Sequence, residues 1–423
     1  MTSAVYAVIG IAALFIFRLW AKLYQQKRPL RIAVLHPNWY FIVIWRRKSH
    51  LSSDQGGGGE RLLWTALVSL SKQYPNAQLI LYTTSKPSDS GNRADLVAKV
   101  QRDFGITVPD QLKIVGLRSF ALADFRLYQS CVLFCHAVAS ILVAIEALFK
   151  GSSDLIVDSY GFPMVIPVFW ITGHRCMTYI HYPWTNATAI KEAYAKISQS
   201  NTLKSALKRV YYTCMYETYR YCLRLCEDIQ CNSTWTLEHV KSVADAKTRA
   251  RIRLVYPPFD LPKYNLNFKD SNIIVSLAQF RPEKNHMTQL DVLKHALTSN
   301  RHVHLHMIGG CRNEQDLQRV EELRQHAKYL NMDNHLTLHV NIPIREVQEI
   351  LKKATYGLHM MIEEHFGISV VEMMAAGIIV LAHNSGGPRD DIITDGKSKN
   401  RKCKPFNHCV AGFLCSDSDE YCR

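Results

Sequence analysis

The stretch Glu363-Glu-His-Phe-Gly-Ile-Ser-Val-Val-Glu372 carries the most information in this chain. From Phe366 onward it predicts a helix that runs to Ala376, with Glu364 just before the helix and Glu372 about one turn into it. Two carboxylates with seven residues between them can accept hydroxyl groups at opposite ends of one ligand. This spacing indicates a site for one ligand that carries hydroxyl groups at both ends.

The start of this predicted helix also suits a phosphate. Gly367 permits close approach, and Ile368 and Ser369 offer backbone N–H groups that a helix start leaves without an intrahelical acceptor. The segment Asn384-Ser-Gly-Gly-Pro388 follows the next strand-like run, Ile378–Ala382, and adds a second glycine loop. Together they favour a ligand site over a solvated helix with incidental acids.

A basic loop follows another strand-like run. Gln279-Phe-Arg-Pro-Glu-Lys-Asn-His286 comes directly after Ile273–Leu277. Ligands of parallel sheets bind at the carboxyl ends of the strands, so Arg281 and Lys284 would place two cations over a diphosphate. The alternative is an exposed charged loop.

Four glycines, Gly56 to Gly59, stand directly before the helix-like run Leu62–Leu70. Glycine backbone can approach an anion closely, and the helix start adds a favourable dipole. A flexible turn explains the glycines equally well.

His181 lies in Tyr179-Ile-His-Tyr-Pro-Trp184, at the end of the strand-like run Met177–Ile180. A histidine there could orient or deprotonate a sugar hydroxyl. A core histidine with satisfied hydrogen bonds is the other interpretation.

The chain alternates strand-like and helical runs, which predicts an α/β fold with two parallel-sheet domains facing a cleft. We expect a membrane anchor over residues 1–29, a first Rossmann-like domain over 30–255, a linker over 256–272 and a second Rossmann-like domain over 273–423. Further strands are predicted at Arg31–Leu35, Gln78–Tyr82, Asp154–Asp158 and His304–Ile308.

Composition excludes several protein classes. With 48% hydrophobic and 21% charged residues the chain is globular. Its formal charge of +15 suits anionic partners, but no nucleic-acid-binding motif accompanies the basic residues, so a phosphorylated ligand and an anionic membrane face are preferred. The twelve cysteines stand mostly in apolar or aromatic stretches, where a free thiol acts as a small hydrophobe.

The amino-terminal run Ala4–Trp20 is apolar except for Arg18 and is followed by basic residues. It lacks the basic start and the cleavage site of a signal peptide, which predicts one uncleaved transmembrane helix with the rest of the chain in the cytosol. A second apolar stretch, Cys131–Phe149, contains His136 and Glu146 and is interpreted as a buried or membrane-surface helix.

Taken together, these residues resemble the retaining glycosyltransferases of the GT-B class that carry an E-x7-E motif. More narrowly they resemble the GDP-mannose-dependent α-1,2-mannosyltransferases of the asparagine-linked glycosylation pathway, which add the fourth and fifth mannoses to a dolichyl-diphosphate oligosaccharide on the cytosolic face of the endoplasmic reticulum. The motifs that carry the resemblance are G-G-G-G-E-R, H-Y-P, Q-F-R-P-E-K-N-H, I-G-G-C-R-N, E-H-F-G-I-S-V-V-E and A-H-N-S-G-G-P.

The resemblance implies that the first Rossmann-like domain lies on the acceptor side and that the second binds the nucleotide sugar. It also implies a role for each site residue, retention of the donor-sugar configuration and no bound metal or other cofactor. The acceptor lipid, the endoplasmic reticulum membrane and other mannosyltransferases of the pathway are the implied partners. The implied roles are diphosphate binding for Arg281 and Lys284, a position near the diphosphate for Gly58 and Gly59, N–H contacts to phosphate for Gly367, Ile368 and Ser369, mannose hydroxyl binding for Glu364, ribose binding for Glu372, and a place near the mannose for His181.

Three segments depart from the family pattern. Trp39–Gln55 stands between the first strand and the glycines, Trp184-Thr-Asn-Ala follows H-Y-P where the family has T-I-S, and the basic Lys397–Cys409 precedes Ala411-Gly-Phe-Leu414. Retained intron sequence or a gene-model error would account for Trp39–Gln55 and Lys397–Cys409. The closing helices expected of the second domain do not follow, so we expect this domain to be truncated. Two alternatives stay open: a related transferase with another sugar nucleotide or lipid acceptor, and an inactive member that only binds a partner.

Overall fold

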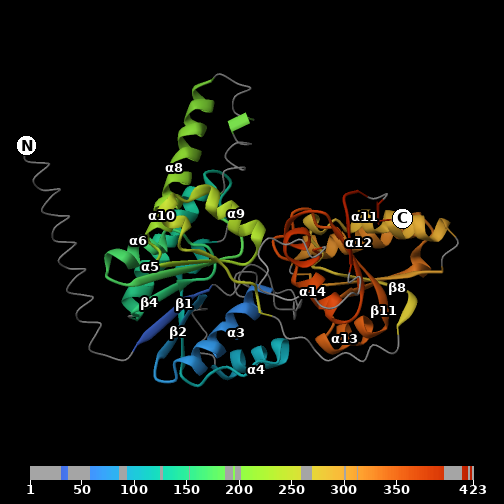
Figure 1. The fold of residues 1–423 in the computed structure, drawn as a ribbon, viewed down its shortest axis with the longest axis horizontal. Coiled ribbons are helices and arrows are strands. Elements are labelled where there is room, and N and C mark those ends of the chain that lie inside the picture. Colours follow the sequence, from blue (N-terminus) through green and yellow to red (C-terminus); the bar gives the residue numbers. More distant parts are fainter. Residues whose placement is uncertain are drawn as a thin grey trace, which may run out of the picture. The chain divides into compact units, whose positions relative to one another are not determined.

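The computed structural model describes residues 30–36, 58–84, 93–123, 127–151, 153–185, 194–195, 202–258, 269–299, 302–311, 313–394, 412–417 and 420–421. The chain divides into two compact units (Figure 1). The first comprises Met1–Arg46, Leu62–Asn232 and Thr236–Tyr256, and the second Arg47–Arg61, Ser233–Trp235 and Pro257–Arg423.

The first unit contains a parallel sheet in the order β3-β2-β1-β4-β5-β6-β7. The buried residues of its central strands are mostly aliphatic, as expected for strands covered on both faces. The strands are β1 (Arg31–Leu35), β2 (Gln78–Thr84), β3 (Leu112–Leu117), β4 (Leu155–Asp158), β5 (Arg175–Ile180), β6 (Asp228–Cys231) and β7 (Ile252–Leu254).

Helices cover both faces of this sheet. One face packs on α3 (Gly58–Gln73) and α4 (Arg93–Phe104), and the other on α5 (Val132–Lys150) and α6 (Val165–Ile171). The remaining helical segments of this region are η1 (Ser119–Ala123), α8 (Leu203–Leu225), α9 (Thr234–Val243) and α10 (Ala246–Arg249).

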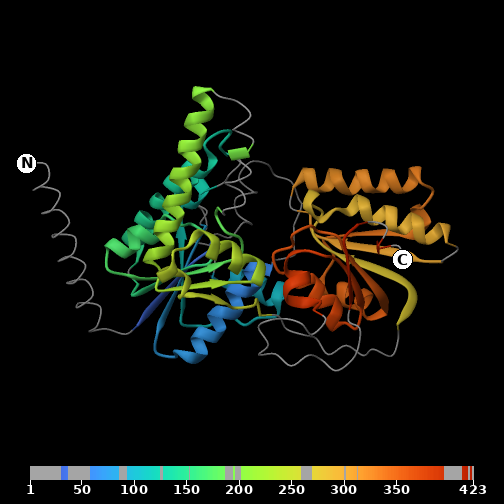
Figure 2. The ribbon, with the colours of Figure 1, turned by 45° about the horizontal axis from the view of Figure 1, so that its top comes forward.

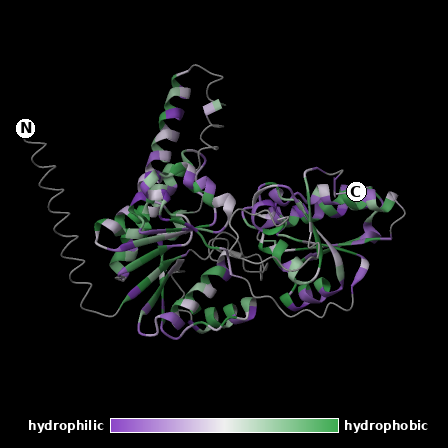
Figure 3. Ribbon diagram, in the orientation of Figure 1, coloured by the Kyte–Doolittle hydropathy of each residue, from purple (hydrophilic) through white to green (hydrophobic). Residues whose placement is uncertain are grey.

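The second unit contains a parallel sheet in the order β10-β9-β8-β11-β12-β13. Apolar residues predominate in its central strands (Figure 3). The strands are β8 (Asp270–Leu277), β9 (His304–Gly309), β10 (Leu336–Val340), β11 (Ala354–His359), β12 (Ile379–His383) and β13 (Gly412–Cys415).

Helices again lie on both faces. The paired helices α11 (His286–Thr298) and α12 (Glu314–Tyr329) cover one face, and α13 (Ile344–Lys353) and α14 (Ile368–Ala375) cover the other (Figure 2). The short segments are η3 (Pro282–Lys284), η4 (Asp333–His335) and η5 (Pro388–Ile392).

The expected α/β architecture with two parallel sheets is confirmed. Every strand predicted within the described ranges is present, and the helix predicted from Phe366 begins at Ile368. The predicted anchor, Trp39–Gln55 and Lys397–Cys409 lie outside the described residues.

Helix α5 corresponds to the second apolar stretch. Among the described helices it is the one long and apolar enough to cross a membrane, judged by length and composition alone. One of its faces, including Val143, Ala144 and Ala147, is buried against the first sheet, and Phe134 and Phe149 are exposed on the other. Because one face of α5 packs on the sheet, α5 agrees with the predicted buried or membrane-surface helix.

Candidate functional site

The carboxyl edge of the first sheet brings together residues that follow three neighbouring strands. His36 follows β1, Ser159 follows β4 and His181 follows β5. His36 is buried, and its Nδ1 lies 3.0 Å from the Oγ of Ser159. Burial and, to a smaller extent, the nearby His181 lower the pKa of His36 to about 3, so His36 is neutral at physiological pH.

Asp158, the last residue of β4, is also buried at this edge. Its Oδ1 accepts the backbone N–H groups of Tyr160 and Gly161, each at 3.1 Å. Burial raises the pKa of Asp158 to about 6, although these hydrogen bonds act to lower it. The first edge therefore combines a neutral histidine with a carboxyl group that titrates near neutrality.

His181 lies at this edge, as its position after a strand predicts. Its ring stands 5.1 Å from that of Tyr179, centroid to centroid, at an interplanar angle of 64°. Thr236 donates a hydrogen bond of 3.4 Å from Oγ1 to the backbone carbonyl of His181. The location at the edge is established, and a contact with a sugar remains a prediction.

Gly58 and Gly59 are the first two residues of α3, a helix of 16 residues. Their N–H groups therefore belong to the first turn, where the helix dipole favours an anion. Gly56 and Gly57 lie outside the described residues.

The carboxyl edge of the second sheet carries charged groups. The loop after β8 contains Arg281 and then η3, whose last residue is Lys284. Arg281 Nη1 lies 3.4 Å from Glu283 Oε1, and the ammonium of Lys284 forms an ion pair with Glu364 Oε2. Lys284 Nζ also lies 3.0 Å from the Sδ of Met361. The structure thus joins two residues that the sequence places 80 positions apart.

Glu364 is the centre of this network. Its Oε2 also lies 3.1 Å from Nε2 of His359, and its Oε1 accepts the backbone N–H of His365 at 3.2 Å. Burial acts to raise the pKa of Glu364, but the hydrogen bond from His359 and the charge of Lys284 lower it more. The net effect holds this pKa well below its usual range, so the carboxylate is ionised.

The helix α14 follows Glu364 in the chain, close to where the sequence predicts a helix to start. Gly367 precedes it with φ of 101°, a left-handed conformation that favours glycine. Ile368 and Ser369 form the start of α14, and Glu372 lies one turn further. Arg61, which belongs to this second unit, places Nη1 at 2.9 Å from Glu372 Oε1. Burial raises the pKa of Glu372, and Arg61 opposes that shift.

The loop that holds Glu364 rests on the Asn384–Pro388 segment. The N–H of Gly387 donates to the carbonyl of Glu364 at 2.7 Å, and the N–H of Glu363 donates to Ser385 Oγ at 2.7 Å. A Cβ at Gly387 would stand 2.3 Å from the carbonyl oxygen of Phe366. The Asn384–Pro388 loop therefore packs closely against the Glu363–Phe366 segment and hydrogen-bonds to it.

Four residues of these edges were not predicted from the sequence: His36, Asp158, Ser159 and His359. Each ends a strand or directly follows one, and this signal could have identified them. In the ranges that the structure describes, no group of three or more His, Cys, Asp or Glu residues is arranged to hold a metal ion.

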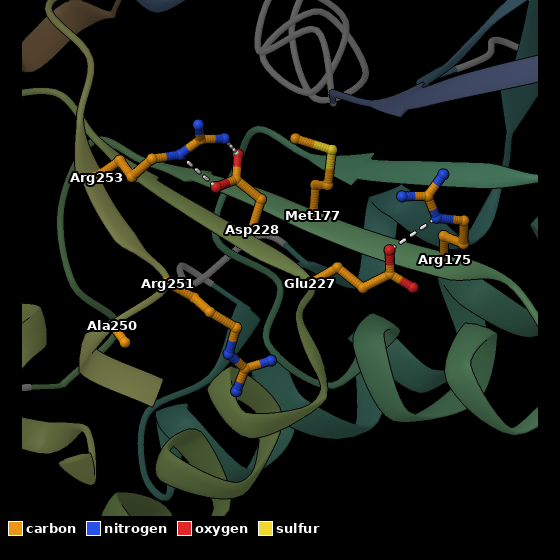
Figure 4. Close-up of a pocket in the computed structure, with 7 residues that line it drawn as sticks. All are labelled: Arg175, Met177, Glu227, Asp228, Ala250, Arg251 and Arg253. Atoms are coloured by element: carbon orange, nitrogen blue, oxygen red, sulfur yellow. Dashed lines mark hydrogen bonds and ion pairs between the residues drawn. The ribbon is translucent and has the colours of Figure 1, made fainter. Parts of the chain in front are cut away.

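A hollow of about 490 Å³ lies elsewhere on the first unit, where β5, β6 and β7 begin (Figure 4). Two of its arginines are in ion pairs, Arg175 with Glu227 at 2.7 Å and Arg253 with Asp228 at 2.6 Å. It lies at the amino ends of the strands, opposite to the edge where parallel sheets bind ligands. None of the predicted site residues lines it.

Comparison with known proteins agrees with this architecture. Residues 48–244 match the family described as ALG11 mannosyltransferase N-terminus, and residues 260–408 match glycosyl transferases group 1. The chain is 34% identical over 392 residues to a GDP-Man:Man(3)GlcNAc(2)-PP-Dol alpha-1,2-mannosyltransferase of Homo sapiens, covering 88% of this chain and 77% of that protein. The protein of the same name from Dictyostelium discoideum is 33% identical over 395 residues, covering 88% and 75%.

Solved structures show the same fold at low identity. TarM superposes with a TM-score of 0.60 at 10% identity, covering 93% of this chain and 91% of that chain. Sucrose-phosphate synthase from Thermosynechococcus elongatus superposes with a TM-score of 0.58 at 14% identity, covering 93% and 88%. These likenesses establish the GT-B fold, and the sequence matches establish the relationship: the chain belongs to the ALG11 mannosyltransferase family of glycosyltransferases.

Proposed function

We propose that this protein transfers mannose from GDP-mannose to a dolichyl-diphosphate-linked oligosaccharide, forming the α-1,2-linked fourth and fifth mannoses of the asparagine-linked glycan precursor. The bond from the mannose anomeric carbon to the diphosphate breaks, and a bond to an acceptor hydroxyl forms with retained configuration. GDP leaves, and the hydroxyl proton is released. The observation that carries the proposal is the ionised Glu364, paired with Lys284, directly before the start of α14.

The proposed donor contacts follow from the charges in the second unit. Arg281 and Lys284 bind the diphosphate and offset the negative charge that develops on the leaving group. Gly367, Ile368 and Ser369 present N–H groups to phosphate at the start of α14, where the helix dipole adds to the attraction. Glu364 accepts mannose hydroxyls and Glu372 accepts ribose hydroxyls.

Three further residues are proposed to contact the donor. Gly58 and Gly59 approach the diphosphate through the first turn of α3, and His181 lies near the mannose. Because two cations are available for the diphosphate, we propose that transfer needs no metal ion or other cofactor.

We also propose that the protein is a single-pass protein of the endoplasmic reticulum membrane with both units in the cytosol. The apolar run Ala4–Trp20 and the basic residues after it support this topology. Exposed apolar residues on one face of α5 support contact with the bilayer that holds the acceptor: Phe134, Val138, Leu142, Ile145 and Phe149. Protease treatment of sealed microsomes should digest both units, and full protection would contradict the topology.

The activity test uses the full-length chain in detergent or vesicles, with labelled GDP-mannose and Man(3)GlcNAc(2)-diphosphate-dolichol. We expect one or two mannoses to be added and then removed by an α-1,2-specific mannosidase. Transfer from UDP-sugars or to another lipid instead would favour a related transferase. A folded protein that binds the acceptor without transferring any sugar would favour an inactive binding partner.

A further inference from the structure

His359 is a buried residue that contacts Glu364. It is the last residue of β11, and its side chain is 2% exposed. Its Nε2 lies 3.1 Å from Glu364 Oε2, the oxygen that also contacts the ammonium of Lys284. The Glu364 carboxylate therefore contacts the imidazole of His359 in addition to its ion pair with Lys284.

The donors are distributed unevenly over the Glu364 carboxylate. Oε2 accepts from Lys284 and His359, whereas the hydrogen bond to Oε1 comes from the backbone N–H of His365, at 3.2 Å. A carboxylate has about four lone-pair sites, two on each oxygen. Oε2 is thus saturated by protein donors, and Oε1 keeps capacity for a hydroxyl group of a ligand.

His359 belongs to the sheet, whereas Glu364 belongs to a loop. Its strand, β11, is paired with β8 on one side and β12 on the other. The buried Tyr421 donates a hydrogen bond of 3.2 Å from its hydroxyl to the carbonyl of His359. Glu364, in contrast, lies in a loop between Glu363 and Gly367, both of which have positive φ. A side chain from the sheet can therefore fix the direction of a side chain from the loop.

We propose that His359 is a positioning residue for sugar recognition: its Nε2–H holds Glu364 Oε2 so that Oε1 stays available to a hydroxyl of the donor sugar. This inference rests on the proposed function for the identity of the donor. It requires the Nε2–H form of the imidazole, because a carboxylate can only accept. His359 itself touches no reacting atom in this scheme.

The test compares two substitutions that differ in reach. Gln places an amide N–H near the position of the histidine Nε2, and Asn carries the same amide on a shorter side chain. We expect His359→Asn to lower kcat/KM for GDP-mannose about tenfold to hundredfold, since misplacement of a binding group by about 1 Å costs up to about hundredfold. We expect His359→Gln to stay within about threefold of wild type.

Binding of GDP separates positioning from a merely structural role. GDP lacks the sugar, so its inhibition constant should change less than twofold in both variants, while a distorted site would weaken GDP binding and donor turnover together. His306→Gln is the matched control, because His306 belongs to the same sheet and hydrogen-bonds with His339 at 2.9 Å. It should leave kcat/KM unchanged. Wild-type kcat/KM in His359→Asn, or equal losses in the Asn and Gln variants, would overturn the proposal.

A measurement on the unsubstituted histidine applies even if both variants fail to fold. In protein labelled with ¹⁵N-histidine, one protonated Nε2 signal should shift when Glu364→Gln is introduced. Absence of any shifted histidine signal would refute the contact. This measurement of the His359–Glu364 contact needs no turnover. The transfer rate of the wild-type protein tests the proposed function, so the positioning role and the proposed function can fail separately.

Discussion

The carboxyl edges of the two sheets shift the pKa of one carboxyl group each, Asp158 and Glu364, in opposite directions. At the first edge, burial keeps His36 neutral and raises the pKa of Asp158 to about 6. At the second edge, Glu364 is also largely buried but remains ionised, because Lys284 and His359 contact it. Burial penalises charge at both edges, and at Glu364 the hydrogen bond from His359 and the charge of Lys284 outweigh that penalty.

This difference is consistent with the proposal that the protein binds two substrates of unlike charge. A nucleotide diphosphate is a permanent anion, and the second edge has cations and a helix start. An acceptor hydroxyl is neutral, and at the first edge the uncharged His36 lies beside the hydroxyl of Ser159. The division into a donor side and an acceptor side remains a proposal.

The largest expected effect comes from removing the charge at the centre of the second edge. Glu364→Ala should lower kcat/KM for GDP-mannose about 10²- to 10³-fold, because the sugar loses its acceptor and Lys284 loses its partner. Steady-state transfer assays would measure this loss. The exposed neighbour provides a control: Glu363→Ala should stay within about threefold, and equal activity of both variants would remove Glu364 from the mechanism.

A smaller effect should follow from moving the Glu364 loop without changing its chemistry. In Gly387→Ala the new Cβ meets the carbonyl oxygen of Phe366 at 2.3 Å, so the loop must shift. We expect kcat/KM to fall about tenfold to hundredfold and stability to fall by about 1 to 3 kcal/mol. Gly105→Ala is the control, because its φ of 68° would strain an alanine, whereas its Cβ meets nothing within 4 Å. Gly105→Ala should lose stability without losing activity; unchanged activity in Gly387→Ala would show that the loop tolerates displacement.

The pH dependence of stability should distinguish the two groups of the first edge. The pKa of His36 falls from 6.5 to about 3 on folding, so the unfolded chain binds more protons between these values and stability decreases as the pH falls through this window. The pKa of Asp158 rises from 3.8 to about 6, so its contribution has the opposite sign, and stability decreases as the pH rises from about 4 to 6.

Substitutions that cannot titrate should reveal these opposite signs. His36→Asn should flatten the loss of stability on acidification, and Asp158→Asn should steepen it. Urea unfolding at intervals between pH 4 and pH 7 would measure both slopes. If both variants changed the slope in the same direction, the electrostatic account of the first edge would be wrong.

The smallest expected effect concerns metal ions. If the cations of the second edge carry the diphosphate charge, incubation with EDTA followed by desalting should leave the transfer rate within about twofold. Loss of activity that a divalent cation restores would contradict this expectation and would assign part of the charge compensation to a metal.

Local patterns were sufficient for much of the fold. Central strands such as β1 and β8 contain short, continuous apolar runs rich in β-branched residues, and this length and composition identify them without any tertiary information. Strands β3, β6, β7, β10, β11 and β13 were not predicted, since several are short or carry polar residues that only pairing with neighbours makes favourable.

The site divides in the same way. The spacing of Glu364 and Glu372, the glycine at a helix start and the cations after a strand are properties of contiguous sequence, so the sequence alone predicted them. The sequence alone did not predict which distant residues meet. Strand order brings Glu364 into contact with Lys284, His359 and Gly387.

The amino-acid sequence by itself determined the glycosyltransferase class, through the family resemblance that its motifs carry, and it predicted the residues of the donor site, because motifs are contiguous in sequence. Only the tertiary structure decided their ionisation and orientation. Desolvation and ion pairing act through space, and strand order sets which groups meet at each edge. For this reason Glu364 is charged and Asp158 titrates near neutrality, a difference that their local sequences do not reveal.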